Sequence, residues 1–186
     1  LQVKMFAASN GDAFLLKDEN PDGFAVLIDG GFASTFRNEI RSELVAMGRE
    51  GRALDLVIAT HIDADHISGL IKFFGENGSA KAPRIVKVEQ VWHNSLRSIP
   101  AHPHRTSRAL SDDDARLLDD ICRRGFALSN ESSRPDEEIG ARQGSSLASL
   151  LLKGGYGWNE SVGRRAIDTS VGEFALGPGA RITVLG

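Results

Sequence analysis

The chain has 186 residues, 41% of them hydrophobic, and a formal net charge of −3 at pH 7. This length and composition are typical of one globular domain, so we expect a single domain over residues 1–186. The single cysteine, Cys122, excludes an intrachain disulfide and a zinc site built from cysteines. No apolar stretch approaches the roughly 20 residues needed to cross a bilayer, and residues 1–16 lack a signal-peptide pattern. We therefore expect a cytoplasmic protein with no membrane partner.

The N-terminal part of the chain is predicted to be mostly strands. Apolar and β-branched runs separated by polar turns indicate strands at Val3 to Ala8, Ala13 to Lys17, Phe24 to Asp29 and Leu54 to Thr60. The polar segment 18–23 contains Pro and Gly and has the length of a hairpin turn, so we expect an antiparallel meander. Between the last two strands, Ser34 can cap a helix that runs to about Met47 and stops at Gly48.

The segment from Thr60 to His66 carries the strongest functional signal. It follows a predicted buried strand, so a rigid element delivers four potential metal ligands into one loop, namely His61, Asp63, Asp65 and His66. Imidazole and carboxylate ligands together are typical of a hydrolytic divalent-metal centre. His61 with Asp63 and Asp65 with His66 form two pairs, which could serve two neighbouring ions that lower the pKa of a bridging water.

The same residues have a simpler interpretation, in which His61 and Asp63 form an exposed polar loop and Asp65 caps the helix that begins near Ile67. Capping alone does not explain two histidines and two aspartates within six residues. Gly69 follows them, and glycine lets another backbone approach closely. The spacing therefore favours a metal site.

The remainder of the chain alternates helices and strands. We expect helices at Ile67 to Phe74, Ser111 to Arg124 and Ser145 to Lys153, with stops at Gly75, Gly125 and Gly154-Gly155. Strands are expected at Ile85 to Trp92, near Glu173 and near Thr183. Residues 129–144 are predicted to be a polar loop, and Asp112 to Asp114 a solvated helix start rather than a metal site. The pattern indicates an α/β (α+β) fold, in which helices cover a layered sheet.

Three further histidines are candidate ligands or substrate contacts. His93 follows the predicted strand at 85–92, and functional loops of open α/β sheets gather at such strand ends. It is either a metal or substrate contact or a strand-end histidine hydrogen-bonded to the backbone. His102 and His104 lie in a loop broken by proline, which favours solvent-exposed or substrate-facing positions over metal binding.

The loop motif resembles the signature of the metallo-β-lactamase-fold hydrolases, His-x-His-x-Asp-His after a strand. Asp63 stands where that pattern has its second histidine, a departure that recurs in the branch resembling the hydrolase-like domain of bacterial competence (DNA-uptake) proteins. Asn10 to Leu16 and Leu27 to Gly31 look like two further motifs of that branch, so the resemblance covers about residues 1–75. It implies a metallo-β-lactamase-like αββα sandwich, of which this chain would hold the N-terminal half to two-thirds.

The resemblance also implies a role for each residue of the motif. His61 and Asp63 would hold a first metal ion, and Asp65 and His66 a second. Asp65 would also orient the attacking water. Two zinc ions are expected in a complete domain, and the oxygen ligand Asp63 moves the preference towards manganese or iron.

Two aspartates from other motifs are implied to support the ligands. Asp12 and Asp29 would lie beside the metals and hold the ligands in orientation through hydrogen bonds. Each has an equally good interpretation as a turn residue that bonds its own local backbone.

Complete members of the family contribute further ligands downstream, namely another histidine, a bridging aspartate and a last histidine. This chain has no histidine after His104 and stops on the apolar segment 182–186. We therefore expect an incomplete hydrolase domain, which a C-terminal segment or a second chain would complete.

Two functions of different classes follow from these patterns. The first is a divalent-metal-dependent hydrolase, in which metal-activated hydroxide attacks an ester or phosphodiester in a small molecule or in nucleic acid. The likeness to DNA-uptake proteins favours a phosphodiester by analogy of fold alone, and thioesters are a same-fold alternative. The second is a catalytically incomplete metal-binding or interaction module, or one half of a split assembly, which the absent downstream ligands support.

Overall fold

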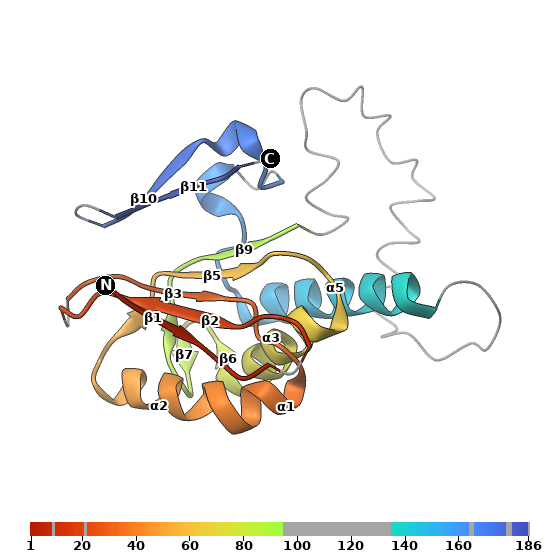
Figure 1. Cartoon of the computed structure of the whole chain (residues 1–186), viewed down its shortest axis with the longest axis horizontal. Coiled ribbons are helices and arrows are strands. Elements are labelled where there is room, and N and C mark those ends of the chain that lie inside the picture. Colours follow the sequence, from red (N-terminus) through yellow and green to blue (C-terminus); the bar gives the residue numbers. More distant parts are fainter. Residues whose placement is uncertain (9, 21, 95–134, 164–165, 178–179, 186) are drawn as a thin grey trace.

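A five-stranded mixed sheet forms the middle of the molecule in the computed structural model (Figure 1). The structure describes residues 1–8, 10–20, 22–94, 135–163, 166–177 and 180–185. In spatial order, the strands of this main sheet are β1 (Gln2–Met5), β2 (Phe14–Lys17), β3 (Ala25–Ile28), β5 (Leu56–Ala59) and β9 (Val91–His93). All five overlap runs that the sequence predicts to be strands.

The sheet changes from antiparallel to parallel pairing at β3. β1, β2 and β3 form the predicted antiparallel meander, with Leu15 opposite Leu27. β5 lies parallel to β3, and β9 lies parallel to β5. The predicted run from Leu54 to Thr60 is not a further meander strand, because a helical crossover first returns the chain to the starting end of the sheet. The run is also divided, since β4 (Ala53–Leu54) pairs with β8 (Lys87–Val88) instead.

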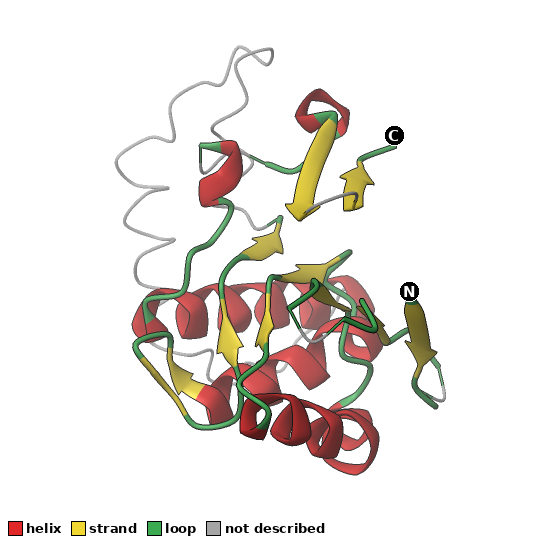
Figure 2. Cartoon of the chain, turned by 90° about the vertical axis from the view of Figure 1, so that its left-hand side faces the viewer, coloured by secondary structure: helices red, strands yellow, loops and turns green. Residues whose placement is uncertain are grey.

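Helices cover one face of the main sheet (Figure 2). They are α1 (Ala33–Thr35), which continues through a π-helical turn (Phe36–Ile40) into α2 (Arg41–Arg49), then α3 (Ala64–Asn77) and α5 (Pro135–Gly154). The core between these layers is apolar, because alternate strand residues such as Leu27 and Val57 face the helices. Leu44, Leu70 and Leu147 complete it from the helix side, and all five side chains are fully buried.

A small hairpin covers part of the opposite face of the main sheet (Figures 1 and 2). It consists of β10 (Glu173–Gly177) and β11 (Ala180–Thr183), at the two places where terminal strands are predicted. Sheet residues that point away from the helices form a second buried cluster, Val26, Leu56 and Trp92. The ring of Phe174 lies edge-on to Trp92, with centroids 5.0 Å apart. The described residues thus form three layers, and the predicted α+β class is confirmed.

The first long helix differs from its prediction at both ends. Phe32, rather than Ser34, precedes the helix, and no side chain caps its first turn. The helix passes through Gly48 and continues to Arg49. Gly51 makes the turn that ends it, with a φ of +74° that glycine adopts readily.

Gly48 serves helix packing rather than helix termination. A Cβ atom at this position would lie 2.0 Å from the carbonyl oxygen of Ile85, a distance that no side-chain carbon can occupy. Ile85 belongs to the segment that leads into β8, so this contact packs α2 closely against that segment. A glycine inside a helical pattern can therefore either end the helix or allow another segment to pack closely against it. Only the segment that packs there distinguishes the two roles.

Helix α3 is longer than predicted. It begins at Ala64, runs past Gly75 without interruption and ends at Asn77, where Gly78 has a φ of +82°. Gly75 is exposed, and a Cβ atom there would meet nothing within 4 Å. The chain then forms a two-stranded hairpin from β6 (Gly78–Ser79) and β7 (Ala82–Pro83).

The buried side chain of Asn77 fixes the end of α3. Its Oδ1 accepts from the backbone N–H groups of Ile85 and Val86, at 2.9 and 3.1 Å. Its Nδ2 donates to the Val86 carbonyl at 3.0 Å and to the Tyr156 hydroxyl at 2.9 Å. Because all hydrogen-bonding positions of the amide are used, its burial carries little penalty. The far end of the helix that begins at the ligand loop is thus anchored.

The segment that follows residue 134 is more helical than its sequence predicts. Helix α5 starts at Pro135, so residues 135–144 are helical where a polar loop is expected, and the helix does not begin at Ser145. The predicted stop at Gly154-Gly155 is confirmed, with Gly155 at a φ of +66°. Within the described parts of the chain, no helix combines the length and the apolar character that crossing a membrane requires.

The predicted strand at 85–92 is interrupted, because β8 and β9 belong to different sheets. Two short 3₁₀ turns, Glu160–Val162 and Thr169–Val171, lie between α5 and the terminal hairpin. The predicted helix from Ser111 to Arg124 and the loop that contains His102 and His104 lie outside the described residues.

We expect Gly48→Ala and Gly75→Ala to change the free energy of unfolding in opposite directions. Gly48→Ala pushes α2 away from the Ile85 carbonyl and lowers this free energy by roughly 1–3 kcal/mol. Gly75→Ala meets open space and raises it by roughly 0.5–1 kcal/mol, because alanine loses less conformational entropy on folding. Urea denaturation of both variants measures the difference. Equal effects of the two substitutions would contradict the packing role of Gly48.

Candidate metal centre

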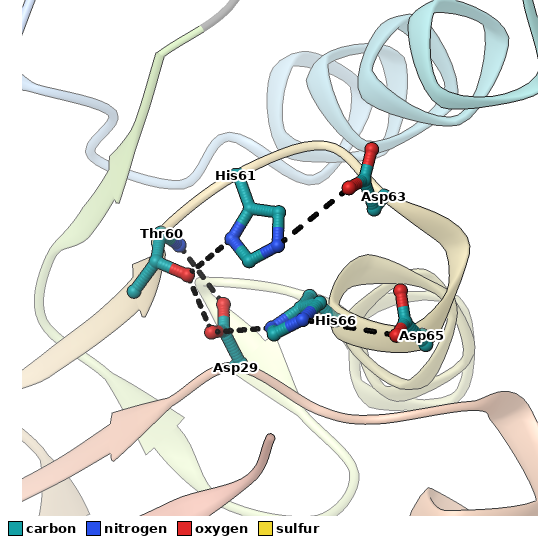
Figure 3. A network of polar contacts seen from close by, with 6 residues as sticks. All are labelled: Asp29, Thr60, His61, Asp63, Asp65 and His66. Carbon is teal, nitrogen blue, oxygen red and sulfur yellow. Dashed lines mark hydrogen bonds and ion pairs between the residues drawn. The ribbon is translucent and has the colours of Figure 1, made fainter. Parts of the chain in front are cut away.

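The predicted ligand loop connects β5 to α3, beside the end of β3. Thr60 directly follows β5, and Asp63 precedes the first residue of α3, so Asp65 and His66 lie in the first helical turn. Asp65 therefore does not cap the helix, and the side chain of Asp63 makes no capping hydrogen bond. Because β3 and β5 are parallel neighbours, they end at the same edge of the sheet, which brings Asp29 next to this loop (Figure 3).

Close backbone contacts hold the turn after β3 against α3. The N–H of Gly30 donates to the carbonyl of His66, and the N–H of Gly69 donates to the carbonyl of Gly31, both at 2.8 Å. A Cβ atom on Gly69 would lie 1.8 Å from the Gly30 carbonyl oxygen. The close approach predicted at Gly69 thus occurs, and it places Asp29 against the first turns of the helix.

Asp29 is a buried carboxylate surrounded by hydrogen-bond donors. It is 2% exposed, and its φ of +55° is rare for a residue other than glycine. Its Oδ1 accepts from the backbone N–H of Thr60 at 2.9 Å. Its Oδ2 accepts from the Thr60 hydroxyl at 2.5 Å and from Nδ1 of His66 at 3.1 Å. These bonds offset the cost of burying the carboxylate and hold its backbone in a strained conformation.

The hydrogen-bond pattern indicates which nitrogen of each imidazole ring is the donor. The carboxylate of Asp29 can only accept, so the proton of His66 is on Nδ1. The hydroxyl proton of Thr60 is donated to Asp29, so the Thr60 oxygen accepts from Nδ1 of His61 at 2.9 Å. In the neutral imidazole, which is the form that binds metal ions, both Nε2 atoms then carry a lone pair that is available to a metal ion.

Each Nε2 atom has a carboxylate near it. Nε2 of His61 lies 3.8 Å from Oδ2 of Asp63, and Nε2 of His66 lies 3.9 Å from Oδ2 of Asp65. Two donor atoms that share a zinc ion with tetrahedral angles are roughly 3.4 Å apart, so each pair is within about half an ångström of ligand spacing. The two imidazole rings lie side by side, with centroids 3.6 Å apart. These pairs are the ones that the sequence indicates.

A second ligand arrangement includes Asp29. Asp29, His61 and His66 each offer one donor atom, and these atoms lie within 4.8 Å of one another. Because both oxygens of Asp29 already accept hydrogen bonds, we interpret Asp29 as the residue that orients the histidines rather than as a ligand. In either arrangement, imidazole nitrogen combined with carboxylate oxygen fits zinc, manganese or iron.

The two pairs differ in their exposure to solvent. The side chains of His66 and Asp65 are 10% and 30% exposed, whereas those of His61 and Asp63 are 45% and 65% exposed. His66 is held by α3 and by Asp29, while the carboxylate of Asp63 lies beside the exposed His61. The inner pair is therefore the better organised of the two.

Asp12 contacts the site through its backbone. Its carbonyl accepts from the N–H of Gly31 at 3.1 Å. Within the described part of the chain, the exposed Asp12 carboxylate joins no group of metal-ligand residues. The neighbouring Gly11 packs on the first turn of α3, since a Cβ atom there would lie 2.0 Å from the Asp65 carbonyl oxygen. The supporting role of the Asp12 side chain stays a prediction.

The ring of His93 lies against α5, and among the described residues it does not join the candidate ligands of the loop. It is 1% exposed, its Nε2 donates to the Gly144 carbonyl at 3.2 Å, and its ring stacks on Trp158. Burial lowers the pKa of His93 from 6.5 to about 4, although the bond to Gly144 opposes this shift. The geometry is that of a neutral strand-end histidine bonded to the backbone.

Sequence reasoning missed the roles of Thr60 and Gly144. Thr60 links Asp29 to His61, and its only local signal is a hydroxyl between a buried strand and the first histidine. Gly144 lies in α5, and a Cβ atom there would lie 3.0 Å from a side-chain methyl carbon of Ile62 in the ligand loop. Nothing local marks Gly144, because its neighbour in space is distant in sequence.

The comparison with protein families identifies the superfamily. The model described as Metallo-beta-lactamase superfamily matches residues 8–135, which is more than half of the chain. The protein therefore belongs to the metallo-β-lactamase superfamily, whose members are generally metal-dependent hydrolases. The match includes the ligand loop and the Asp29 turn. A search among curated proteins found no match.

We expect Thr60→Val to weaken divalent-metal binding by roughly 10- to 100-fold. The substitution keeps the branched shape of the side chain but removes the hydroxyl that joins Asp29 to His61. Thr60→Ser keeps the hydroxyl and serves as the matched control, with affinity close to that of the wild type. Competition titration against a chromophoric chelator measures both variants. Equal weakening by Val and Ser would rule out the hydroxyl as the cause.

We expect His93 to make stability depend on pH. Its pKa in the folded protein, about 4, is below the ordinary 6.5, so the unfolded chain takes up the proton first as the pH falls. The contribution of neutral His93 is fully present above about pH 6.5 and is lost by about pH 4, a decrease of up to roughly 3 kcal/mol. Urea denaturation across this range should give a flatter pH profile for His93→Phe. Parallel profiles would show that His93 does not titrate in this way.

Proposed function

We propose that this protein is a divalent-metal-dependent hydrolase that cleaves an ester or phosphodiester bond. The observation that carries the proposal is the pair of histidines beside Asp29, each with its Nε2 atom near a carboxylate. Membership of a superfamily of metal-dependent hydrolases supports it independently. The position at the ends of parallel strands, where α/β proteins gather their sites, also favours it.

In this proposal each residue of the site has a defined role. His61 and Asp63 hold a first cation, and Asp65 and His66 hold a second. Asp65 is also the candidate that accepts a proton from the attacking water and orients it, because its carboxylate is partly exposed beside the histidines. Asp29 keeps both histidines in the tautomer that leaves Nε2 free.

The donor set bears on the identity of the metal. When bound, a divalent cation supplies Lewis acidity and lowers the pKa of water towards neutrality. Zinc is the expected metal for a site with two imidazoles, whereas the carboxylate of Asp63 in place of a third imidazole favours manganese or iron. The rings of His61 and His66 pack closely against each other. This favours two ions bound side by side in one site over two ions bound at sites far apart.

A phosphodiester, in a small molecule or in nucleic acid, is the substrate class we favour. This preference depends on the resemblance of residues 1–75 to the DNA-uptake branch, in which an aspartate also stands at the position of Asp63. It is an analogy within one fold, and one fold hosts many chemistries. Carboxylic esters and thioesters are the alternatives, since attack by an activated water serves all three.

The alternative function is a metal-binding or interaction module without turnover, or one half of a split assembly. The exposure of His61 and Asp63 favours it, because a pair that is 45% and 65% exposed is poorly organised for catalysis. In the described residues, one group of three potential ligand residues converges, Asp29, His61 and His66. Such a site could bind a single cation and acquire further ligands from another segment or chain.

We expect His61→Ala and Asp65→Ala each to reduce metal-dependent hydrolysis at least about 100-fold. Glu50→Ala, which removes an exposed carboxylate at the end of α2, is the control and leaves the rate unchanged. Metal content is measured together with hydrolysis of bis-p-nitrophenyl phosphate, p-nitrophenyl acetate and a thioester.

The two functions give different results in this experiment. Stoichiometric metal without hydrolysis of any of the three substrates favours the binding module. Hydrolysis that survives both substitutions would refute the assigned site.

A further inference from the structure

A cavity of about 340 Å³ lies between the main sheet and the terminal hairpin. One side is formed by the carboxyl ends of β5 and β9, from Ile58 to Thr60 and from Trp92 to Asn94. The other side is formed by Ile167 and, at the end of β11 and just after it, by Ile182, Val184 and Leu185. Figure 1 shows the hairpin above these two strands. The cavity thus opens at the same edge of the sheet as the ligand loop.

The side chains of Thr60 and Asn94, which line the cavity, have hydrogen bonds within the protein, whereas Nδ1 of His93 has no partner among the described residues. Asn94 donates from Nδ2 to the Ile167 carbonyl at 2.8 Å and accepts from the Ile167 N–H at 2.7 Å. The hydroxyl of Thr60 donates to Asp29. The ring of His93 is on the helix side of the sheet, where it hydrogen-bonds α5. Most of the residues that line the cavity are apolar, and the side chains of Thr60 and Asn94 are already engaged within the protein.

The remaining lining of the cavity is apolar and only partly covered. Ile58, Ile182 and Val184 are half-buried and pack against the second hydrophobic cluster. The indole N–H of Trp92 donates to the hydroxyl of Ser161, so its ring adds apolar surface to this cluster. Concave apolar surface beside a reactive centre is typical of a ligand site. A cavity of roughly 150 Å³ already holds a benzene ring, so this one has room for an aromatic ring or a short alkyl chain.

Thr60 joins the cavity to the candidate metal centre. It lines the cavity, and its hydroxyl oxygen lies 2.9 Å from Nδ1 of His61. Thr60 is the residue of the ligand loop that lines the cavity, so a ligand whose apolar part fills the cavity reaches the loop at Thr60.

We propose that this cavity binds an alkyl or aryl group of the substrate, next to the bond that is cleaved. The substrate class is then an ester or phosphodiester with a hydrocarbon group directly attached. The cleavage step in this statement rests on the proposed function, whereas binding of the hydrocarbon group does not.

Titration with acetate and hexanoate tests the apolar site, with tryptophan fluorescence as the readout because Trp92 lines the cavity. Both metal-free and manganese-loaded protein are titrated. Hexanoate is expected to bind at least about tenfold more tightly than acetate, because its chain buries more apolar area. Manganese is expected to tighten the binding of both carboxylates, because their charged ends reach the ligand loop.

A matched pair of substitutions assigns this preference to the cavity. Val184→Phe fills the cavity and is expected to remove the preference for hexanoate. Leu176→Phe enlarges a residue of the same cluster outside the cavity and is expected to keep it. If Val184→Phe does not fold, Ile58→Phe fills the cavity from the β5 side.

The outcomes separate this inference from the proposed function. Equal affinities for the two carboxylates in the wild type, or a preference that survives filling of the cavity, would overturn the apolar site. A preference for hexanoate that manganese leaves unchanged would support the apolar site and count against the metal-dependent reaction beside it.

Discussion

The candidate site depends on one buried carboxylate. Asp29 is removed from water, and a carboxylate is stable there only because hydrogen-bond donors surround it. Two of those donors belong to Thr60 and one to His66, so the bonds that satisfy Asp29 also orient His66 and, through the hydroxyl, His61. The hydrogen bonds that stabilise the buried Asp29 carboxylate are thus the same bonds that orient the imidazole rings of His61 and His66.

Glycines let the chain pack closely enough to make these contacts. Gly30 and Gly69 bring the turn after β3 onto α3, and Gly11 brings the turn before β2 onto the same helix, in each case with no room for a Cβ atom. Asp29 and His66, the buried half of the site, are therefore closely packed. The outer half is exposed to solvent. This difference suits a centre that receives a ligand from outside while one histidine keeps its orientation.

Local patterns predicted the elements of the fold better than their ends. Apolar alternation indicated the central strands, and helical spacing indicated α2 and α3, because both signals arise from nearby residues. The local pattern predicts helix stops at Gly48 and Gly75, yet Gly48 is required by the Ile85 carbonyl, and Gly75 faces open space. Residues 135–144 carry no apolar periodicity, so the sequence does not reveal the start of α5, which packs along α3.

The sequence by itself determined that His61, Asp63, Asp65 and His66 leave a buried strand together, since their short spacing and the preceding apolar run are local properties. Only the tertiary structure decided which of their donor atoms lie close together. The tautomers follow from Asp29, which the parallel pairing of β3 and β5 brings to the loop. His93 ends the next strand, yet it faces α5 instead. The direction of a side chain and the position of its proton depend on partners that are distant in sequence.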